Sequence, residues 1–405
     1  MIGINLKNGF LQGDLVIWVV LFLLCMISII EVYSASSNMT YSPDKAYWAP
    51  VLQHGLLVCL ALAVAWGMHA MSIGMVRLTL LTGYLAALVM LVMVLASNNR
   101  VNNAARWIEF AGITIQPSEI AKLTLVGTVA FALARGWDKK TQRTGKTAFK
   151  WVVGFTVVTC GLIFTENFST AGIIALVMVM LTWMANPPKK MFYGICLSLV
   201  SLASVVLITV KNLPDTALDW MDRNVSGRAT TWVNRLRASN DLPPDPKEYP
   251  IHENVQVTHA RIAVATSGFL GLGPGKSVER DFLPQAYSDF IYAIIIEEGG
   301  LLSGGVVMAL YLLLLYRSMR IARRCKNRFP AYLTMGLSLM LVTQAFVNMA
   351  VAVGAMPVTG QPLPLVSKGG TSMFITNAYI GIILCVSRNA KQIEKEEDLE
   401  KQQLT

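Results

Sequence analysis

Three carboxylates stand in or beside an apolar run in residues 282–300, which read FLPQAYSDFIYAIIIEEGG. Asp289 lies at the edge of this run beside an aromatic residue, and its own segment contains no cation. A carboxylate that no neighbouring cation neutralises, placed at the mouth of a cavity, can take a proton as a general base. We therefore predict that Asp289 is the catalytic residue, with a carboxylate that has no catalytic role as the alternative.

Glu297 and Glu298 lie inside the same run. If one straight helix enters the membrane near Ser288, both lie about 12–14 Å deeper than Asp289, at a rise of 1.5 Å per residue. Ionisable residues inside a membrane are costly, so they normally face a polar cavity or one another. We assign both to the substrate cavity. The alternative is an ionic network that only fixes helix packing, because adjacent helical positions cannot face the same way.

A further pair of charges occurs in the sequence QPSEIAKL, where Glu119 and Lys122 are three positions apart. We expect a helix to begin at Pro117, and the spacing then puts both side chains on one helix face, where they can pair. The same two interpretations apply to this pair. It shapes a polar cavity, or it only holds helices together.

The elements that position these residues are membrane helices. Of the 405 residues, 54% are hydrophobic and only 14% are charged, whereas about a quarter of the residues of a soluble protein are charged. We predict an all-α polytopic membrane protein, a single domain over residues 1–405, with ten transmembrane helices. The ten apolar segments are about 15–34, 50–69, 76–97, 117–135, 148–166, 169–186, 191–210, 289–316, 329–353 and 371–387.

The net charge of +10 reflects topology and does not indicate nucleic-acid binding. With the N-terminus in the cytoplasm, twenty Lys and Arg residues fall on the cytoplasmic side and four in the short outer segments. The positive-inside rule then places both termini in the cytoplasm, with a tail at about 388–405. The six cysteines avoid the outer loops, so no disulfide is expected, and the four histidines lack metal-ligand spacing.

Two outer segments depart from simple connections. The loop between helices 7 and 8, at about 211–288, is long enough to be functional, and its SGRATTWVNRL stretch predicts a short surface helix. The sequence GAMPVTGQPLPLVSKGGTS carries three prolines, so we expect residues 361–365 to be extended. Thr371 or Ser372 is then able to cap the last helix. Irregular backbone at this depth is tolerated where it lines a cavity or is buried in protein.

Three stretches, RWIEFAGITIQPSEIAKL, GFLGLGPGKSVERDFLPQAYSDFIYAIIIEEGG and PVTGQPLPLVSKGGTS, resemble the SEDS family (shape, elongation, division and sporulation) of cell-wall polymerases. The resemblance covers nearly the whole chain. It implies a peptidoglycan glycosyltransferase that polymerises lipid II into glycan strands at the outer face of the cytoplasmic membrane. Asp289 matches the family's catalytic Asp in P-x-x-x-x-D-F, and Glu119 with Lys122 matches the cavity pair in QPSE-x-x-K.

The motif SKGGTS matches the family's loop before the last span. Its candidate cavity residues are Ser367, Lys368, Gly369, Gly370 and Thr371. One departure concerns the sixth span, where the family often reads PD-x-GTA and this chain reads ENFSTA, with Asn167 in place of the acid. An essential acid at that position is therefore not expected here.

A pyrophosphate leaving group requires positive charge, from basic side chains or from a divalent cation such as Mg or Mn. The candidate cations, all on the outer side or in the outer half, are Arg106, Lys122, Arg228, Arg261 and Lys368. The resemblance also implies a class B penicillin-binding protein and other division proteins as partners. The overall sequence of the last span and the loop before it, LPLVSKGGTSMFITNAYIGIILCVSR, resembles the division-type subfamily, which acts at the septum of the inner membrane, more than the elongation type. A lipid II flippase and a non-catalytic scaffold remain the alternatives.

Overall fold

A computed structural model describes residues 11–35, 49–96, 107–110, 113–164, 167–214, 233, 255–283 and 287–403. Helices account for most of them. The helices are α1 (Leu15–Ala35), α2 (Ala49–Ala70), α3 (Ile73–Ala96), α4 (Pro117–Arg135), α5 (Lys146–Phe164), α6 (Phe168–Met184), α7 (Lys189–Asn212), α10 (Val255–Thr266), α11 (Ile291–Arg324), α12 (Arg328–Ala352) and α13 (Gly370–Gln403), with a 3-10 turn η3 (Glu279–Asp281).

Each of the ten apolar segments predicted from the sequence corresponds to one of these helices, with ends that differ by a few residues, which confirms an all-α polytopic membrane protein. Within the described part of the chain, nine helices are long and apolar enough to cross a membrane. The remaining one, α6, has 17 residues, slightly fewer than a crossing usually needs. A tenth crossing therefore stays a prediction. The surface helix expected near residue 230 lies outside the described residues, apart from Val233.

Local sequence explains where the helices around the site begin. Pro117 opens α4, as predicted, because its fixed φ suits a first helical turn and its missing N–H would have no partner there. Asn167 caps α6, since its side-chain oxygen accepts a hydrogen bond from the Thr170 N–H at 3.2 Å. The residue that replaces the family's acid thus performs the local task of starting the helix.

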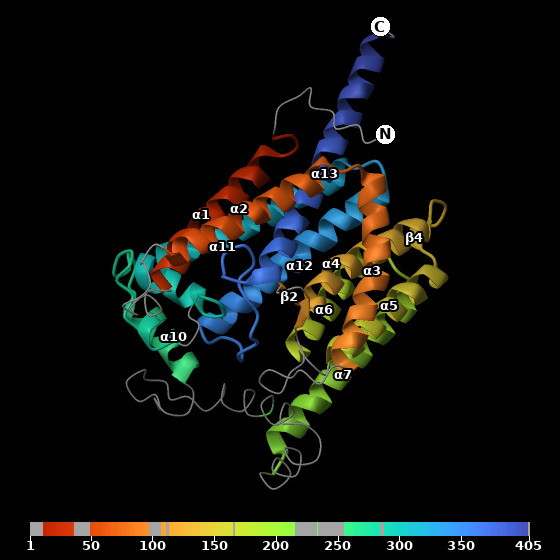
Figure 1. The fold of residues 1–405 in the computed structure, drawn as a ribbon. Coiled ribbons are helices and arrows are strands. Elements are labelled where there is room, and N and C mark those ends of the chain that lie inside the picture. Colours follow the sequence, from red (N-terminus) through yellow and green to blue (C-terminus); the bar gives the residue numbers. More distant parts are fainter. Residues whose placement is uncertain are drawn as a thin grey trace.

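Three helices form the centre of the bundle (Figure 1). In α4, α12 and α13, 78%, 72% and 83% of the most apolar stretch is buried, against 6% in α7, which lies at the edge. α12 packs against α4, α6, α11 and α13, while α13 also packs along α2. Residues carried by α4, α12 and the segment entering α13 are therefore positioned by the best-packed part of the protein.

The bundle has two chemically distinct ends. At the first, here called the basic end, Asp14 just before α1 contacts the Nε atom of Arg317 on α11 at 3.0 Å, and Arg388 of α13 donates to the Met71 carbonyl at 2.7 Å. Arg135 and Lys189 lie at helix termini on the same side by the alternation of the helices. The other end, called the opposite end, carries Ala35, Ala352 and Gly370. Short antiparallel hairpins that the sequence did not predict connect helices at both ends, β1–β2 (Ile108–Phe110, Ile113–Ile115) and β3–β4 (Trp137–Asp138, Arg143–Thr144).

α11 is not one straight helix. Gly300 has φ 73° and ψ −177°, which no α-helix contains. The Tyr292 hydroxyl donates to the Gly304 carbonyl at 3.1 Å, and the Ser303 hydroxyl to the Ile295 carbonyl at 2.7 Å. Residues 292 and 304 would be about 18 Å apart along a continuous helix. The chain therefore folds back at Gly300, so that residues 291–299 pack against the start of residues 301–324.

This reversal corrects the predicted depth of the acids. Residues 301–324 run from the opposite end to the basic end, and residues 291–299 run the other way. Glu297 and Glu298 consequently lie closer to the opposite end than Asp289 does, and the expectation that they lie deeper was wrong. The prediction treated residues 289–316 as one continuous helix, so it did not include a turn at Gly299 and Gly300. The six cysteines are free in the structure.

Candidate functional site

Asp289 lies two residues before the short helix of residues 291–299, and its side chain is half-buried. The Ser288 hydroxyl donates to one carboxylate oxygen, Oδ1, at 3.0 Å. Gly360 lies close to the other oxygen, because a Cβ atom built on that glycine would be 3.6 Å from Oδ2. Asp289 is thus reached by its own chain on one side and by residues 357–369, the segment before α13, on the other.

α12 holds both of these segments through one side chain. The Asn348 amide donates to the Asp289 carbonyl at 2.8 Å and to the Gln361 carbonyl at 2.7 Å. Gln361 is itself buried and donates to Thr170 of α6 at 2.9 Å. Sequence analysis did not single out Asn348. Its signal was available, since Gln344 and Asn348 are the two amide side chains of a mostly apolar span and are four positions apart, on one face of the helix.

The segment of residues 357–369 is joined directly to the residues that precede Asp289. The Ser367 hydroxyl donates to the Ser288 carbonyl at 2.6 Å and accepts from the Leu363 N–H at 2.7 Å. The Lys368 N–H donates to the Tyr287 carbonyl at 2.9 Å. The Lys368 ammonium lies 5.1 Å from the centre of the Tyr287 ring, and partial burial lowers its pKa from the usual value. Ser367 and Lys368 therefore belong to the same site as Asp289.

The carbonyls of this segment are hydrogen-bonded by side chains from the helices beneath it. Gln344 donates to the Pro362 carbonyl at 3.2 Å, Tyr311 donates to that of Pro364, and Ser28 donates to that of Val366 at 2.7 Å. Irregular backbone in a membrane protein requires such partners, because lipid supplies none. The network explains how a segment without helix or strand is held in place.

Residues 364–366 form a turn, so the extended conformation predicted for residues 361–365 was only partly right. Leu365 has φ 68°, in the left-handed region that a leucine avoids. Its side chain is buried, and the turn is closed by the Ser367 N–H, which donates to the Leu363 carbonyl at 2.9 Å. Strain of this kind costs about 1–3 kcal/mol and persists where surrounding contacts enforce it.

Glu119 and Lys122 pair as predicted. The Lys122 ammonium lies 2.7 Å from Glu119 Oε1, and both side chains are almost fully buried. The same ammonium donates to Gln344 Oε1 at 2.7 Å. Because Gln344 also binds the Pro362 carbonyl, the pair is connected to the segment of residues 357–369. Gln344, which binds the pair, lies one helical turn of α12 away from Asn348, the residue that binds the Asp289 carbonyl.

Glu297 and Glu298 bind a different part of the protein. Glu297 accepts from the Val278 N–H at 2.9 Å and from the Glu279 N–H at 3.2 Å. Glu298 accepts from the Gly275 N–H at 2.8 Å and lies 3.8 Å from the Arg280 guanidinium. Both carboxylates therefore contact residues 275–280, contrary to the expectation that adjacent positions face apart. The glycine-rich segment of residues 268–275 wraps around the end of the short helix, so that both carboxylates can reach the residues around it.

The other predicted site residues are placed as follows. The Arg261 guanidinium on α10 donates to the Gly354 carbonyl at the end of α12, at 3.0 Å. The Thr371 hydroxyl accepts from the Gln116 N–H at 3.3 Å, so it links α13 to the start of α4. Gly369 follows Lys368 directly, and Gly370 is the first residue of α13. Arg106 and Arg228 lie outside the described residues.

The described carboxylates do not by themselves form a metal site. No group of three or more His, Cys, Asp or Glu side chains suited to a metal occurs in the described part of the chain. Glu119 is engaged by Lys122, and Glu297 and Glu298 are engaged by backbone N–H groups. Asp289 alone would supply one carboxylate, and Mg²⁺ held so sparsely takes its remaining ligands from water and substrate phosphates.

Comparison with known proteins gives consistent results. The sequence model of the FtsW/RodA/SpoVE family, described as "Cell cycle protein", matches residues 14–392. The chain is 29% identical over 356 residues to "Probable peptidoglycan glycosyltransferase FtsW" of Idiomarina loihiensis, covering 84% of this chain and 79% of that protein. It is 30% identical over 380 residues to the protein of the same name from Halomonas elongata, covering 92% and 90%.

A solved structure shares the fold. It is described as "Structural coordination of polymerization and crosslinking by a peptidoglycan synthase complex". One of its chains matches this protein with a TM-score of 0.70 and 22% identity, over 94% of this chain and 99% of that chain.

Proposed function

Because the chain belongs to the FtsW/RodA/SpoVE family of cell cycle proteins, we propose that it is a peptidoglycan glycosyltransferase of the division type, FtsW. It polymerises lipid II into glycan strands at the outer face of the cytoplasmic membrane, for septal wall synthesis. The relatives at 29% and 30% identity carry the FtsW name, which favours the division type over the elongation type, RodA. The protein is a multi-pass membrane protein.

One observation carries the assignment of Asp289 as the general base. Its backbone is fixed by Asn348 of α12, and its neighbours Tyr287 and Ser288 are fixed by residues 367 and 368. The carboxylate is half-buried between these elements. A base must hold its position within hydrogen-bond reach of the proton it removes, and the packed helices around Asp289 provide that rigidity.

The reaction follows from this placement. The acceptor sugar hydroxyl of lipid II gives its proton to the Asp289 carboxylate as its oxygen bonds to the anomeric carbon of the lipid-linked strand. The bond from that carbon to the pyrophosphate breaks, and the lipid pyrophosphate leaves with the electron pair. Ser288 hydrogen bonds the carboxylate, so it orients the oxygen that receives the proton.

The leaving pyrophosphate needs a cation near Asp289. Of the candidate cations in the described residues, Lys368 contacts the segment 287–289, whereas Lys122 binds Glu119 and Arg261 binds Gly354. We assign Lys368 to the pyrophosphate, together with Arg106 and Arg228. A divalent cation would bind Asp289 only jointly with the substrate phosphates.

The basic end faces the cytoplasm in this proposal, with both termini, because Lys and Arg residues concentrate there. Asp289 then lies toward the outer side, where lipid II is used. A class B penicillin-binding protein supplies the cross-linking activity. The shared fold with a chain from a structure described in terms of polymerization and crosslinking supports that partnership.

The decisive experiment assays strand synthesis from purified lipid II by the full chain, alone and together with a class B penicillin-binding protein. Asp289→Asn keeps the shape of the side chain but removes its basicity, so synthesis should fall by a factor of about 10²–10⁴. Asp281→Asn, which changes a carboxylate that is 46% exposed, is the matched control and should retain full activity. Wild-type rates from Asp289→Asn would refute the assignment.

The same proteins in sealed vesicles separate the two remaining alternatives. A flippase would move lipid II across the membrane without forming strands. A scaffold would do neither, and Asp289 would then be dispensable for its function.

A further inference from the structure

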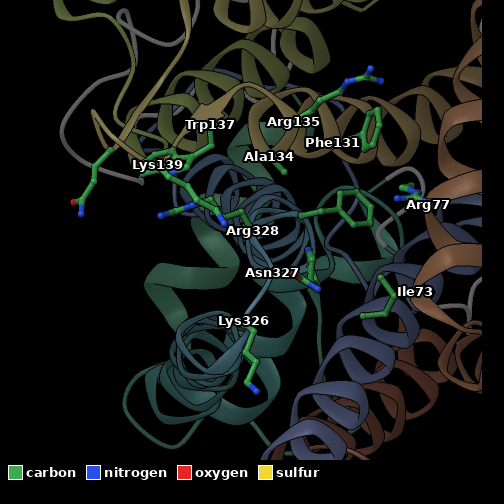
Figure 2. A pocket seen from close by; sticks show the side chains of 13 residues that line it. Ile73, Arg77, Phe131, Ala134, Arg135, Trp137, Lys139, Lys326, Asn327 and Arg328 are labelled. Carbon is green, nitrogen blue, oxygen red and sulfur yellow. The ribbon is translucent and has the colours of Figure 1, made fainter.

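A large pocket opens at the basic end, remote from Asp289 (Figure 2). Its volume is about 870 Å³. Side chains from five elements surround it: α3, α4, the β3–β4 hairpin, the turn between α11 and α12, and the start of α12. The proposed catalytic site contributes none of its residues. The pocket is therefore a separate feature that the polymerase reaction does not explain.

The pocket is strongly positive. Five of the thirteen residues that line it are basic, and none is acidic. The basic residues are Arg77, Arg135, Lys139, Lys326 and Arg328. Among the described residues, no carboxylate forms an ion pair with Arg77, Arg135, Lys139 or Arg328. The nearby Asp138 instead accepts hydrogen bonds from the Lys140 N–H and the Thr141 hydroxyl. Such a concentration of positive charge favours a bound anion.

Aromatic rings orient two of the guanidinium groups. Arg328 lies over the Trp137 ring at 3.5 Å from its centre, and Arg77 lies over the Phe131 ring at 5.8 Å. A guanidinium stacked through its face keeps its N–H donors along its edge, which suits phosphate oxygens. Figure 2 shows Arg328 beside Trp137, and Arg77 on the far side of the pocket, reaching in from α3.

An apolar groove of about 550 Å³ adjoins this pocket and shares Phe131 and Arg135 with it. Its other walls include Leu81 of α3 and Trp151 and Phe155 of α5. Leu81 is one helical turn farther from the basic end than Arg77, and Trp151 and Phe155 are on the membrane span of α5. The groove therefore leads from the charged pocket toward the membrane interior.

We propose that the pocket binds the phosphate head group of an anionic glycerophospholipid, whose acyl chain lies in the groove. A phosphate carried by a lipid satisfies both parts at once, because its charge meets the arginines while its chain covers Leu81, Trp151 and Phe155. A soluble phosphate would use the pocket but leave the groove uncovered. In the proposed orientation the ligand is a lipid of the cytoplasmic leaflet, where basic pockets between helices recognise such head groups.

The test is a lipid titration of the full-length, detergent-solubilised protein, followed by native mass spectrometry. The first phosphatidylglycerol molecule should bind at least about tenfold more tightly than the first phosphatidylcholine molecule, since each cation near an anionic lipid head group adds to the binding affinity. Arg77→Gln with Arg135→Gln and Arg328→Gln should abolish that preference. The control is Lys189→Gln with Lys190→Gln and Arg320→Gln, which removes three exposed cations at the same end outside the pocket and should keep the preference.

Two further arms separate a lipid from a soluble phosphate. Glycerol phosphate at millimolar concentration should fail to displace bound phosphatidylglycerol. Thr147→Trp, which fills the groove from an exposed position on α5, should weaken lipid binding by several-fold. If glycerol phosphate displaces the lipid and Thr147→Trp changes nothing, the site takes a soluble anion and the lipid proposal fails.

Equal losses in the pocket variant and its control would mean that positive charge alone attracts lipid, which also overturns the proposal. Should the triple variant unfold, Arg135→Gln alone decides the matter. This exposed residue borders both the pocket and the groove. Its replacement should reduce the preference for phosphatidylglycerol by about fivefold, and an unchanged preference would contradict the inference.

Discussion

The side-chain amide of Asn348 lies 2.8 Å from the carbonyl oxygen of Asp289, and it donates a hydrogen bond to it. The same amide also binds the Gln361 carbonyl at 2.7 Å. One residue of a well-buried helix therefore fixes the distance between the candidate base and the segment that carries Ser367 and Lys368. Asn348 is almost fully buried. If its amide were removed, a water molecule could take its place only if the neighbouring side chains repacked.

Replacing Asn348 by Leu should slow strand synthesis by roughly 10–100-fold, because a small displacement of a catalytic group is costly. Stability should also fall by about 1–3 kcal/mol for each carbonyl left without its partner. Both are measured on purified protein, as the rate from lipid II and the thermal midpoint in detergent. Ser338→Ala is the control on the same helix, since its hydroxyl bonds only within α12. A full rate for Asn348→Leu would show that Asp289 is positioned by other contacts.

Glu119 and Lys122 should behave as one unit. Removing either partner leaves a buried charge uncompensated, at a cost of roughly 3–5 kcal/mol. Removing both, as Glu119→Gln with Lys122→Met, should cost clearly less than the sum of the single changes. A double-mutant cycle on stability in detergent measures this coupling. Strictly additive losses would mean that the 2.7 Å contact contributes little.

Some of this site could be predicted because its physics is local. The helices follow from the length of apolar runs, the pairing of Glu119 with Lys122 follows from helical spacing, and Pro117 marks a helix start. These features depend on residues a few positions apart. The contacts of Asn348 do not, because its partners lie 59 and 13 positions away in the chain, and spacing along one helix contains no information about them.

Glu297 and Glu298 show where sequence reasoning failed. Their depth was predicted from a straight helix, whereas the chain reverses at Gly300. Residues 268–275 contain four glycines, which allow another part of the backbone to come close. In the structure they approach the end of the short helix, where the Gly273 N–H donates to the Glu298 carbonyl at 2.8 Å. The prediction that the loop at about 211–288 is functional is not tested by the described residues.

Glu297→Gln should destabilise the protein by about 1–3 kcal/mol without a comparable effect on the rate per folded molecule. The Val278 and Glu279 N–H groups both donate to Oε1, and glutamine keeps an oxygen there, but these bonds lose their charge assistance. The amide N–H2 group would replace Oε2, which now accepts from the Ser277 hydroxyl, so that hydroxyl loses its acceptor. Thermal unfolding in detergent and strand synthesis, normalised to folded protein, separate the two effects. Asp281→Asn is the control from the same region and should change neither. A large loss of rate at unchanged stability would return Glu297 to the reaction itself.

Gly300→Ala should destabilise the protein more than any other glycine substitution proposed here. Its φ of 73° with ψ of −177° suits glycine alone, at a cost to alanine of about 1–3 kcal/mol. A Cβ atom would also lie 2.1 Å from the Phe269 carbonyl oxygen, which is backbone and cannot rotate away. The turn that brings residues 291–299 back would then open, and Asp289 would lose its position along with its helix.

Gly268→Ala provides the matched control, because Gly268 has φ +62° but no atom within 4 Å of an added Cβ. Gly268→Ala should lower the free energy of unfolding by about 1–2 kcal/mol, because alanine disfavours the left-handed backbone conformation. It should leave strand synthesis intact. The two variants differ in the close approach at Gly300 and in the turn it makes. Thermal midpoints in detergent and rates from lipid II are compared side by side. If Gly300→Ala is no worse than Gly268→Ala in both measurements, α11 does not reverse at this glycine, and Glu297 and Glu298 return to the deeper position that a straight helix predicts.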